Sequence, residues 1–268
     1  MGTASHGGRG SLGFPFFALK RKLYIIGGHL MKLIKIIGKT LLFVLSLLLA
    51  VVLTLAFLLL LTFLQEKILM PEQHLYWIMK SPYSYLFLFF EVELIAFMGY
   101  FLSKEIKSAV RYVQKKLERT LPHWKRWRNG SLIFVNLLLV YLLFIHVSVL
   151  TEEGIIDHSA FNPQGTFHAY ESLSAIDTGI HGEKKKSLTF QGEFYYKVTL
   201  ENGRVLNLAD MGGSSTEEDF RFVLSRLDKR LLDLGIPKIS STENLSYLYE
   251  TLDPIYVEAI EVMLTRTE

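Results

Sequence analysis

The sequence predicts an α+β membrane protein, in which three transmembrane helices precede a small antiparallel β domain closed by a helix, with further helices at the end. Two observations predict this class. Residues 40–64 carry no charge, and two more apolar runs cover residues 83–102 and 131–149; about 20 apolar helical residues cross a bilayer core. From residue 150 onward, short β-branched and aromatic runs alternate with turns and then give way to helical periodicity.

Charge is divided along the chain, although the net charge is only +3. Residues 1–150 hold 18 Lys and Arg against 6 Asp and Glu, whereas residues 151–268 hold 11 against 20. Basic residues beside membrane crossings favour the cytoplasmic side and attract anionic lipid. We therefore expect the bilayer and anionic lipid headgroups as partners, and no nucleic acid. Because the chain has no cysteine, disulfides and thiolate chemistry are excluded.

Residues 1–39 are predicted to be a cytoplasmic N-terminal segment. A basic stretch from Met31 leads into the first apolar run, as at a natural start, and the codons of Gly27-Gly28 can spell a ribosome-binding sequence. We expect residues 1–30 to be an over-extended reading of the gene; the alternative is a tail followed by a basic amphipathic stretch. The first run is too long for a cleaved signal peptide and is predicted to remain as an anchor.

The connections between the apolar runs predict the topology. Seven Lys and Arg precede the first run, two lie between the first and second, and nine lie between the second and third. By the positive-inside rule, residues 103–130 face the cytoplasm of a bacterial cell, and residues 65–82 and the C-terminal domain lie outside. Tyr76 and Trp77 are expected in the outer interfacial belt. His146, near the outer end of the third run, is assigned no role.

Residues 103–130 are predicted to form a basic amphipathic helix along the inner leaflet, ended by Pro122. The apolar residues recur at helical spacing from Ile106 to Leu121, and basic residues occupy the other faces. The helix either anchors the chain or recognises anionic lipid. The candidate lipid-contacting residues are Lys107, Arg111, Lys115, Lys116 and Arg119, together with Lys184, Lys185 and Lys186 on a loop of the acidic domain.

Glu91 and Glu93 lie in the second apolar run, where a charged carboxylate costs at least about 2.5 kcal/mol. Two positions along a helix differ by about 200° of rotation, so both glutamates cannot face one site. We expect at most one of them to point toward Asn136 of the third run. The alternatives are a proton or cation relay and an interhelical hydrogen bond.

The C-terminal domain is predicted over residues 150–236, with a helical extension over residues 237–268. Asn202-Gly203 is a strong hairpin signal. Ser215 with Glu218 indicates the start of a helix, which Gly235 and Pro237 end, and Asp253-Pro254 indicates the start of another.

Residues 149–159, 170–176 and 196–208, followed by one amphipathic helix, resemble the bacterial pleckstrin-homology-like domains that are attached to membrane helices. The resemblance covers residues 147–233 and lies in structural rather than chemical motifs. It implies a role in binding or assembly, in which the domain binds a protein, a peptide or a lipid headgroup.

No catalytic, cofactor or metal site is predicted. The spacing of His158, His168 and His181 does not suit a metal, and Asp157-His158 is interpreted as the surface of a strand because no serine has a nucleophile-elbow context. We expect a non-enzymatic protein with a protein partner or self-association. The competing functions are a small oligomeric transporter or proton-coupled subunit that uses Glu91 or Glu93, and an enzyme regulator that acts through the basic helix.

Overall fold

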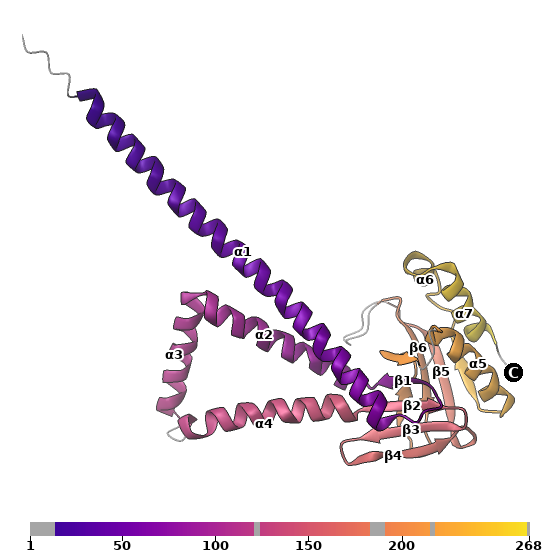
Figure 1. Ribbon diagram of the computed structural model, residues 1–268. Helices are drawn as coiled ribbons and strands as arrows, with labels where there is room; N and C mark the ends of the chain where they lie inside the picture. Colours follow the sequence, from indigo (N-terminus) through magenta and orange to yellow (C-terminus); the bar gives the residue numbers. More distant parts are fainter. Residues whose placement is uncertain (1–13, 121–123, 183–190, 215–217, 267–268) are drawn as a thin grey trace, which may run out of the picture. The chain divides into compact units, whose positions relative to one another are not determined.

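The structure is a computed structural model, which describes residues 14–120, 124–182, 191–214 and 218–266. Figure 1 shows long helices in the first half of the chain and two β sheets with short helices in the second half. The chain divides into two compact parts, residues 1–53 with 92–116 and residues 54–91 with 117–268. The α+β class predicted from the sequence is confirmed.

The first half of the chain is helical because apolar residues without turn signals dominate it. A single 56-residue helix, α1, covers Phe14–Leu69. A 3₁₀ turn, η1 (Tyr83–Leu86), leads into α2 (Phe87–Leu102), and α3 (Lys104–Thr120) and α4 (Trp124–Ile145) follow. Two stretches are long and apolar enough to cross a membrane, Ile36–Leu69 and Tyr83–Phe101. The described residues thus contain two candidate spans.

The third predicted span is shorter in the structure than in the sequence analysis. Its apolar helical part is Gly130–Ile145, which is about 24 Å long at 1.5 Å per residue and shorter than a bilayer core of about 30 Å. The difference arises at the C-terminal end, because the helix stops at Ile145 and Val147–Thr151 form strand β2. Val147 and Val149 belong to the apolar run of the sequence, but they are buried in the β domain rather than exposed to lipid.

The β domain contains two sheets. The first has the order β4-β3-β2-β1-β8, and the second has the order β7-β6-β5-β9, in which only β5 and β9 are parallel. The first sheet consists of β1 (His74–Met79), β2 (Val147–Thr151), β3 (Gly154–Ser159), β4 (Asn162–Ala169) and β8 (Gly212–Ser214). The second consists of β5 (Ala175–Ile180), β6 (Phe194–Thr199), β7 (Val205–Asn207) and β9 (Lys238–Ser240).

Strand β1 comes from the segment between the first two apolar runs, which we had predicted to be a simple outer loop. It pairs antiparallel with β2, with Trp77 opposite Val149 and Met79 opposite Val147, and its other edge pairs with β8. The interfacial role predicted for Tyr76 and Trp77 is wrong, because these side chains are 1% and 6% exposed. Burial in the sheet accounts for their aromatic character.

Side chains on the two faces of the first sheet pack into two different apolar clusters. On one face, Tyr76 and Leu150 join the main core, which extends through the second sheet to the helices that follow it. On the other face, Trp77, Met79 and Val149 pack with Leu69 at the end of α1. Strands β1 and β2 are therefore buried on both faces of the sheet.

Gln65 provides a polar link between α1 and α4. Its fully buried amide donates hydrogen bonds of 3.0 Å to the carbonyl oxygens of Leu143 and Phe144. These carbonyls lie in the last turn of α4, where the helix offers no backbone donors. The hydrogen bonds thus hold the end of α1 against the end of α4.

Helix α5 (Phe220–Asp233) closes the main core with Val223, Leu224, Leu227 and Leu231. Asp219 caps the helix by accepting a hydrogen bond from Arg221 N. The start predicted at Ser215 was therefore too early, and Ser215 itself lies outside the described residues. At the other end the chain turns at Gly235, whose φ is +75°, as the sequence predicted.

The C-terminal extension contains a strand as well as helices. β9 joins the second sheet, and α6 (Ser246–Thr251) and α7 (Pro254–Thr265) follow it. The prediction for the start of α7 is confirmed, because the Asp253 side chain accepts a hydrogen bond from Ile255 N and Pro254 is the first helical residue.

A buried carboxylate on α5 fixes this extension to the domain. Asp228 Oδ1 accepts hydrogen bonds from the Tyr196 hydroxyl at 2.8 Å and from Lys238 Nζ at 2.5 Å, and Oδ2 accepts one from Arg266 at 3.1 Å. The side chains of Asp228 and Lys238 are 0% and 3% exposed. Removing one partner of such a pair leaves an uncompensated charge in the core.

We predict that Asp228→Asn lowers the free energy of unfolding by about 3 kcal/mol, because Lys238 loses its counter-charge. Thermal or denaturant unfolding of the full chain in an uncharged detergent measures the change. Asp233→Asn, on the exposed end of the same helix, is the matched control and is expected to change stability by less than about 0.5 kcal/mol. Equal effects of the two substitutions would contradict this role of Asp228.

Candidate functional site

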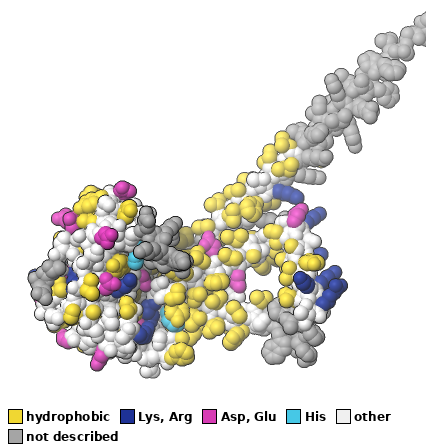
Figure 2. Space-filling view, turned by 180° about the vertical axis from the view of Figure 1, so that it is seen from behind, with side chains coloured by type: hydrophobic (Ala, Val, Ile, Leu, Met, Phe, Trp, Pro, Cys, Tyr) yellow, Lys and Arg dark blue, Asp and Glu magenta, His cyan; other side chains and the backbone are white. Residues whose placement is uncertain are grey.

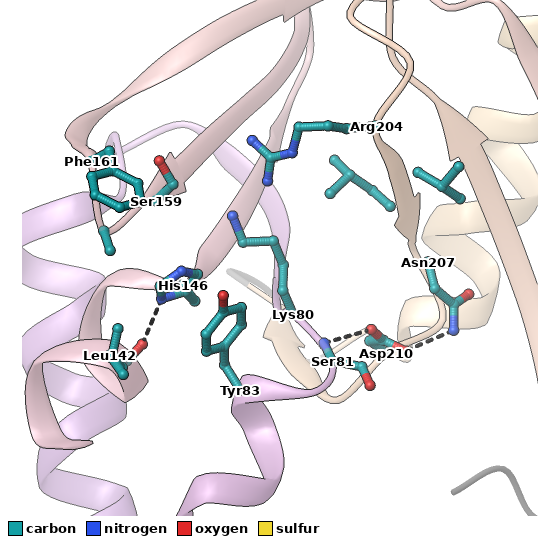
Figure 3. A pocket seen from close by; sticks show the side chains of 13 residues that line it. Lys80, Ser81, Tyr83, Leu142, His146, Ser159, Phe161, Arg204, Asn207 and Asp210 are labelled. Atoms are coloured by element: carbon teal, nitrogen blue, oxygen red, sulfur yellow. Dashed lines mark hydrogen bonds between the residues drawn. The ribbon is translucent and has the colours of Figure 1, made fainter. Parts of the chain in front are cut away.

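A cavity of about 500 Å³ lies within the larger compact part, where the end of α4 meets the β domain. Its volume is in the range of small-molecule sites. Figure 3 shows its side chains from close by. The cavity is lined by Lys80, Ser81, Tyr83, Leu142, His146, Ser159, Ala160, Phe161, Arg204, Val205, Leu206, Asn207 and Asp210.

Asp157 anchors the cationic side of the cavity from strand β3. It is fully buried, and its Oδ1 accepts hydrogen bonds from Lys80 Nζ at 2.7 Å and from the Ser148 hydroxyl at 2.8 Å. Lys80 Nζ also donates to the carbonyl of His158. Arg204 Nη1 forms an ion pair of 2.5 Å with Asp157 Oδ2, but Oδ2 has no aligned hydrogen bond. Arg204 is thus held at Asp157 by an ion pair rather than by an aligned hydrogen bond.

The two cations differ in their exposure. The Lys80 side chain is 8% exposed, whereas that of Arg204 is 46% exposed. Burial lowers the pKa of Lys80, although its hydrogen bond with Asp157 and the charge of that carboxylate oppose the shift. Lys80 is therefore a buried structural charge, and Arg204 is the cation that a ligand in the cavity can reach.

Tyr83 and His146 form the side of the cavity nearest to the helices. Their rings stack with centroids 3.5 Å apart and planes 18° apart. His146 Nδ1 donates a hydrogen bond to the Leu142 carbonyl at 3.0 Å, because a carbonyl can only accept. Nε2 is the ring nitrogen that this hydrogen bond does not use. Burial lowers the pKa of His146. A neutral imidazole is thus favoured in the folded protein.

Asp210 lies on the opposite side of the cavity with both oxygens occupied. Oδ2 accepts from Ser81 N at 3.1 Å, and Oδ1 accepts from Asn207 Nδ2 at 2.7 Å; Figure 3 marks both bonds. Burial raises the pKa of Asp210, which these hydrogen bonds partly offset. The aspartate links the end of β1 to the segment after β7.

The site residues predicted from the sequence lie elsewhere. In α2, Glu91 is half-buried and Glu93 is exposed. The Asn136 amide donates to the carbonyl of Leu132, one turn earlier in α4. The pairing of Asn136 with a glutamate stays a prediction.

The basic residues predicted to contact lipid are on α3, and none of the residues of this helix is buried. Figure 2 shows a gathering of Lys and Arg side chains on one face of the molecule. Ile106 and Val113 on the apolar side of α3 are exposed as well. The loop residues Lys184, Lys185 and Lys186 lie outside the described residues.

The cavity could not be predicted from the sequence because its residues come from four separate segments. Asp157 and His158, interpreted as strand surface, are 1% and 3% exposed, since the first sheet places them beside Lys80. His146 was assigned no role and lines the cavity. The only features of the sequence that point to this cavity are a lysine in a loop with few charges, Lys80, and an aspartate within an apolar strand, Asp157.

The cavity presents both polar and apolar groups. In the part of the chain that the structure describes, no group of three or more His, Asp or Glu side chains is placed to hold a metal ion. The cavity combines cationic and hydroxyl donors with apolar walls from Leu142, Phe161 and Leu206. No protein-family model, curated protein or solved structure matches this chain.

We predict that Asp157→Asn lowers the free energy of unfolding by about 3 kcal/mol near neutral pH, because Lys80 stays buried without its counter-charge. The folded pKa of Lys80 is already below its unfolded value, and the substitution lowers it further. Between the folded and the unfolded pKa of Lys80, the unfolded state binds more protons than the folded state, so the free energy of unfolding rises with pH. The loss should therefore be smaller at about pH 9.5 than at pH 7.

Denaturant unfolding at the two pH values measures this effect. The double variant Asp157→Asn with Lys80→Met is the control, since it removes the stranded charge and should recover part of the loss. A loss that is independent of pH and is not recovered would contradict the role given to Lys80.

Proposed function

We propose that this chain is a non-enzymatic, multi-pass membrane protein whose β domain binds a ligand at the membrane surface. The observation that carries the proposal is the origin of strand β1. This strand lies between the two candidate spans, and it pairs with β2, which follows directly on the apolar helix α4. Segments next to three apolar helices thus build one sheet, so the domain is continuous with the helix ends.

The strand pairing also supports the placement of two segments of the chain on the same side of the membrane. Partners in one sheet cannot lie on opposite sides of a bilayer, so residues 70–82 and the C-terminal domain share a side. The charge pattern assigns that side to the outside of the cell and assigns the basic helix α3 to the cytoplasm. In this topology α4 crosses the membrane despite its short apolar part, with the basic residues at its start near the inner headgroups.

The architecture of the domain is in keeping with the pleckstrin-homology-like resemblance of the sequence. Strands β1–β4 form one antiparallel sheet together with β8, β5–β7 form an antiparallel meander, and α5 then closes the core. A β barrel or sandwich closed by a helix is the fold that the resemblance implies. It supports a binding module, since the cavity beside the helix ends has the size of a ligand site.

Single cysteines test the topology, because the chain has none of its own. We predict that a membrane-impermeant maleimide labels Glu72→Cys and Glu201→Cys in intact bacterial spheroplasts, and labels Lys115→Cys only after permeabilisation. All three positions are exposed, so accessibility within the protein does not limit the reaction. The protein is also expected to stay in the membrane during alkaline carbonate extraction.

Three results would contradict this proposal. Carbonate release of the chain would show that it is not integral to the membrane. Labelling of Lys115→Cys and Glu201→Cys from the same side would show that α4 does not cross. Labelling of Glu72→Cys and Glu201→Cys from opposite sides would contradict the strand pairing itself.

A further inference from the structure

The two carboxylates at the cavity already interact with donors and cations of the protein. Both oxygens of Asp210 accept hydrogen bonds, from Ser81 N and from Asn207. Asp157 Oδ1 accepts from Lys80 and Ser148, and its Oδ2 faces Arg204. A ligand that mainly donates hydrogen bonds would compete with these groups for the carboxylates.

The donors of the same cavity are unused. A guanidinium carries five N–H groups, and within the described residues the side chain of Arg204 makes one contact, the ion pair with Asp157. The Tyr83 hydroxyl has no hydrogen-bond partner among those residues, whereas Nε2 of the neutral His146 ring carries no proton and is an acceptor. Figure 3 shows Arg204 and Lys80 extending into the cavity, with the hydroxyl end of Tyr83 beside His146. The unused donors of Arg204 and Tyr83 line one cavity and fit an anion.

The charge of the cavity restricts which anion fits. Lys80 and Arg204 are matched by Asp157 and Asp210, so the formal charges cancel when His146 is neutral. The site therefore recognises its ligand through oriented donors rather than through an excess of positive charge. A group with a single negative charge and several acceptor oxygens, as in a phosphodiester, suits this arrangement better than a dianion.

The apolar walls indicate where such a group would come from. Leu142 lies in the last turn of α4, and the side chain of Phe161 is fully exposed beside it. The Tyr141 hydroxyl donates to the Ala160 carbonyl at 3.0 Å and fixes this β3–β4 turn to the helix. If the helices cross the membrane as proposed above, the cavity lies at headgroup depth, and acyl chains could extend along α4.

We propose that this cavity binds the phosphodiester group of a phospholipid headgroup, with Arg204 and Tyr83 as hydrogen-bond donors. Asp157 holds the guanidinium at the edge of the cavity through one of its nitrogens, and the other N–H groups bind the phosphate oxygens. Lys80 holds Asp157 in place through its hydrogen bond to Oδ1. This site rests on the proposed function, because it needs the helix ends to lie at the membrane surface.

Native mass spectrometry of the full chain in an uncharged maltoside detergent tests the site, with dioctanoyl phosphatidylglycerol as the probe. Dioctanoylglycerol, which lacks the phosphate, is the matched lipid, and inorganic phosphate is the soluble competitor. We expect phosphatidylglycerol to bind and dioctanoylglycerol not to bind. Phosphate in excess should displace little lipid, since it lacks the apolar contacts.

Arg204→Gln should weaken the binding of phosphatidylglycerol about tenfold or more, as expected for a lost charge-assisted hydrogen bond. Arg226→Gln is the matched control, because Arg226 is also an exposed arginine ion-paired with a carboxylate, that of Glu218, but lies on α5 away from the cavity. It should change the affinity by less than about twofold, a difference below 0.5 kcal/mol. Tyr83→Phe, which keeps the ring, should weaken binding several-fold and decides the matter if Arg204→Gln does not fold.

Three outcomes would overturn the site. Equal weakening by Arg204→Gln and Arg226→Gln would indicate diffuse surface attraction. Equal binding of dioctanoylglycerol would exclude phosphate recognition, and displacement by inorganic phosphate at equal concentration would exclude a lipid source. If the lipid does not bind but the cysteines are labelled as predicted, the lipid site alone is refuted. If the labelling differs from the prediction, the proposed function is refuted.

Discussion

The pairing of β1 with β2 is the interaction on which the rest of the structure depends. The chain leaves α1, crosses the sheet once as β1 and re-enters a helix at η1, and its partner strand starts two residues after α4. A further backbone hydrogen bond of 3.0 Å, from Lys80 N to the His146 carbonyl, extends the ladder beyond the strand. This pairing places Lys80 against Asp157 and Tyr83 against His146, and so it forms the cavity. The amide of Gln65 adds a polar link between α1 and α4 at the same level.

Two buried carboxylates organise the domain in different ways. Asp228 is surrounded by Tyr196, Lys238 and Arg266 and joins the C-terminal extension to α5. Asp157 has a buried partner in Lys80 but a half-exposed one in Arg204. Because breaking a buried ion pair costs more than the pair contributes, both aspartates constrain the packing around them. Only the cluster of Asp157 leaves donors directed at a cavity.

Patterns local in sequence predicted the fold well, and pairings between distant segments could not be predicted. Apolar length identified the two candidate spans, Asn202-Gly203 the β6–β7 hairpin, and Asp253-Pro254 the start of α7. Strand β1 could not be distinguished from a loop, because six strand-like residues between apolar runs carry no signal for a partner about 70 residues away. For the same reason Asp157 was taken for surface and the end of the third run for lipid-facing helix. The cavity needs all these segments together, so no local pattern indicated it.

The most direct test of this account is a disulfide between β1 and β2 in a chain without native cysteines. Met79 and Val147 are direct partners on one face of the sheet, with Cβ atoms about 4.5–5.5 Å apart, so Met79→Cys with Val147→Cys should form an intramolecular disulfide. Met79→Cys with Ser148→Cys should not, because the Ser148 side chain contacts Asp157 on the other face. Peptide mass spectrometry of the unreduced full chain in membranes distinguishes the two. A cross-link in the first variant alone is the predicted result. No cross-link in the first variant, or equal cross-linking in both, would contradict the pairing on which the domain, the topology and the cavity depend.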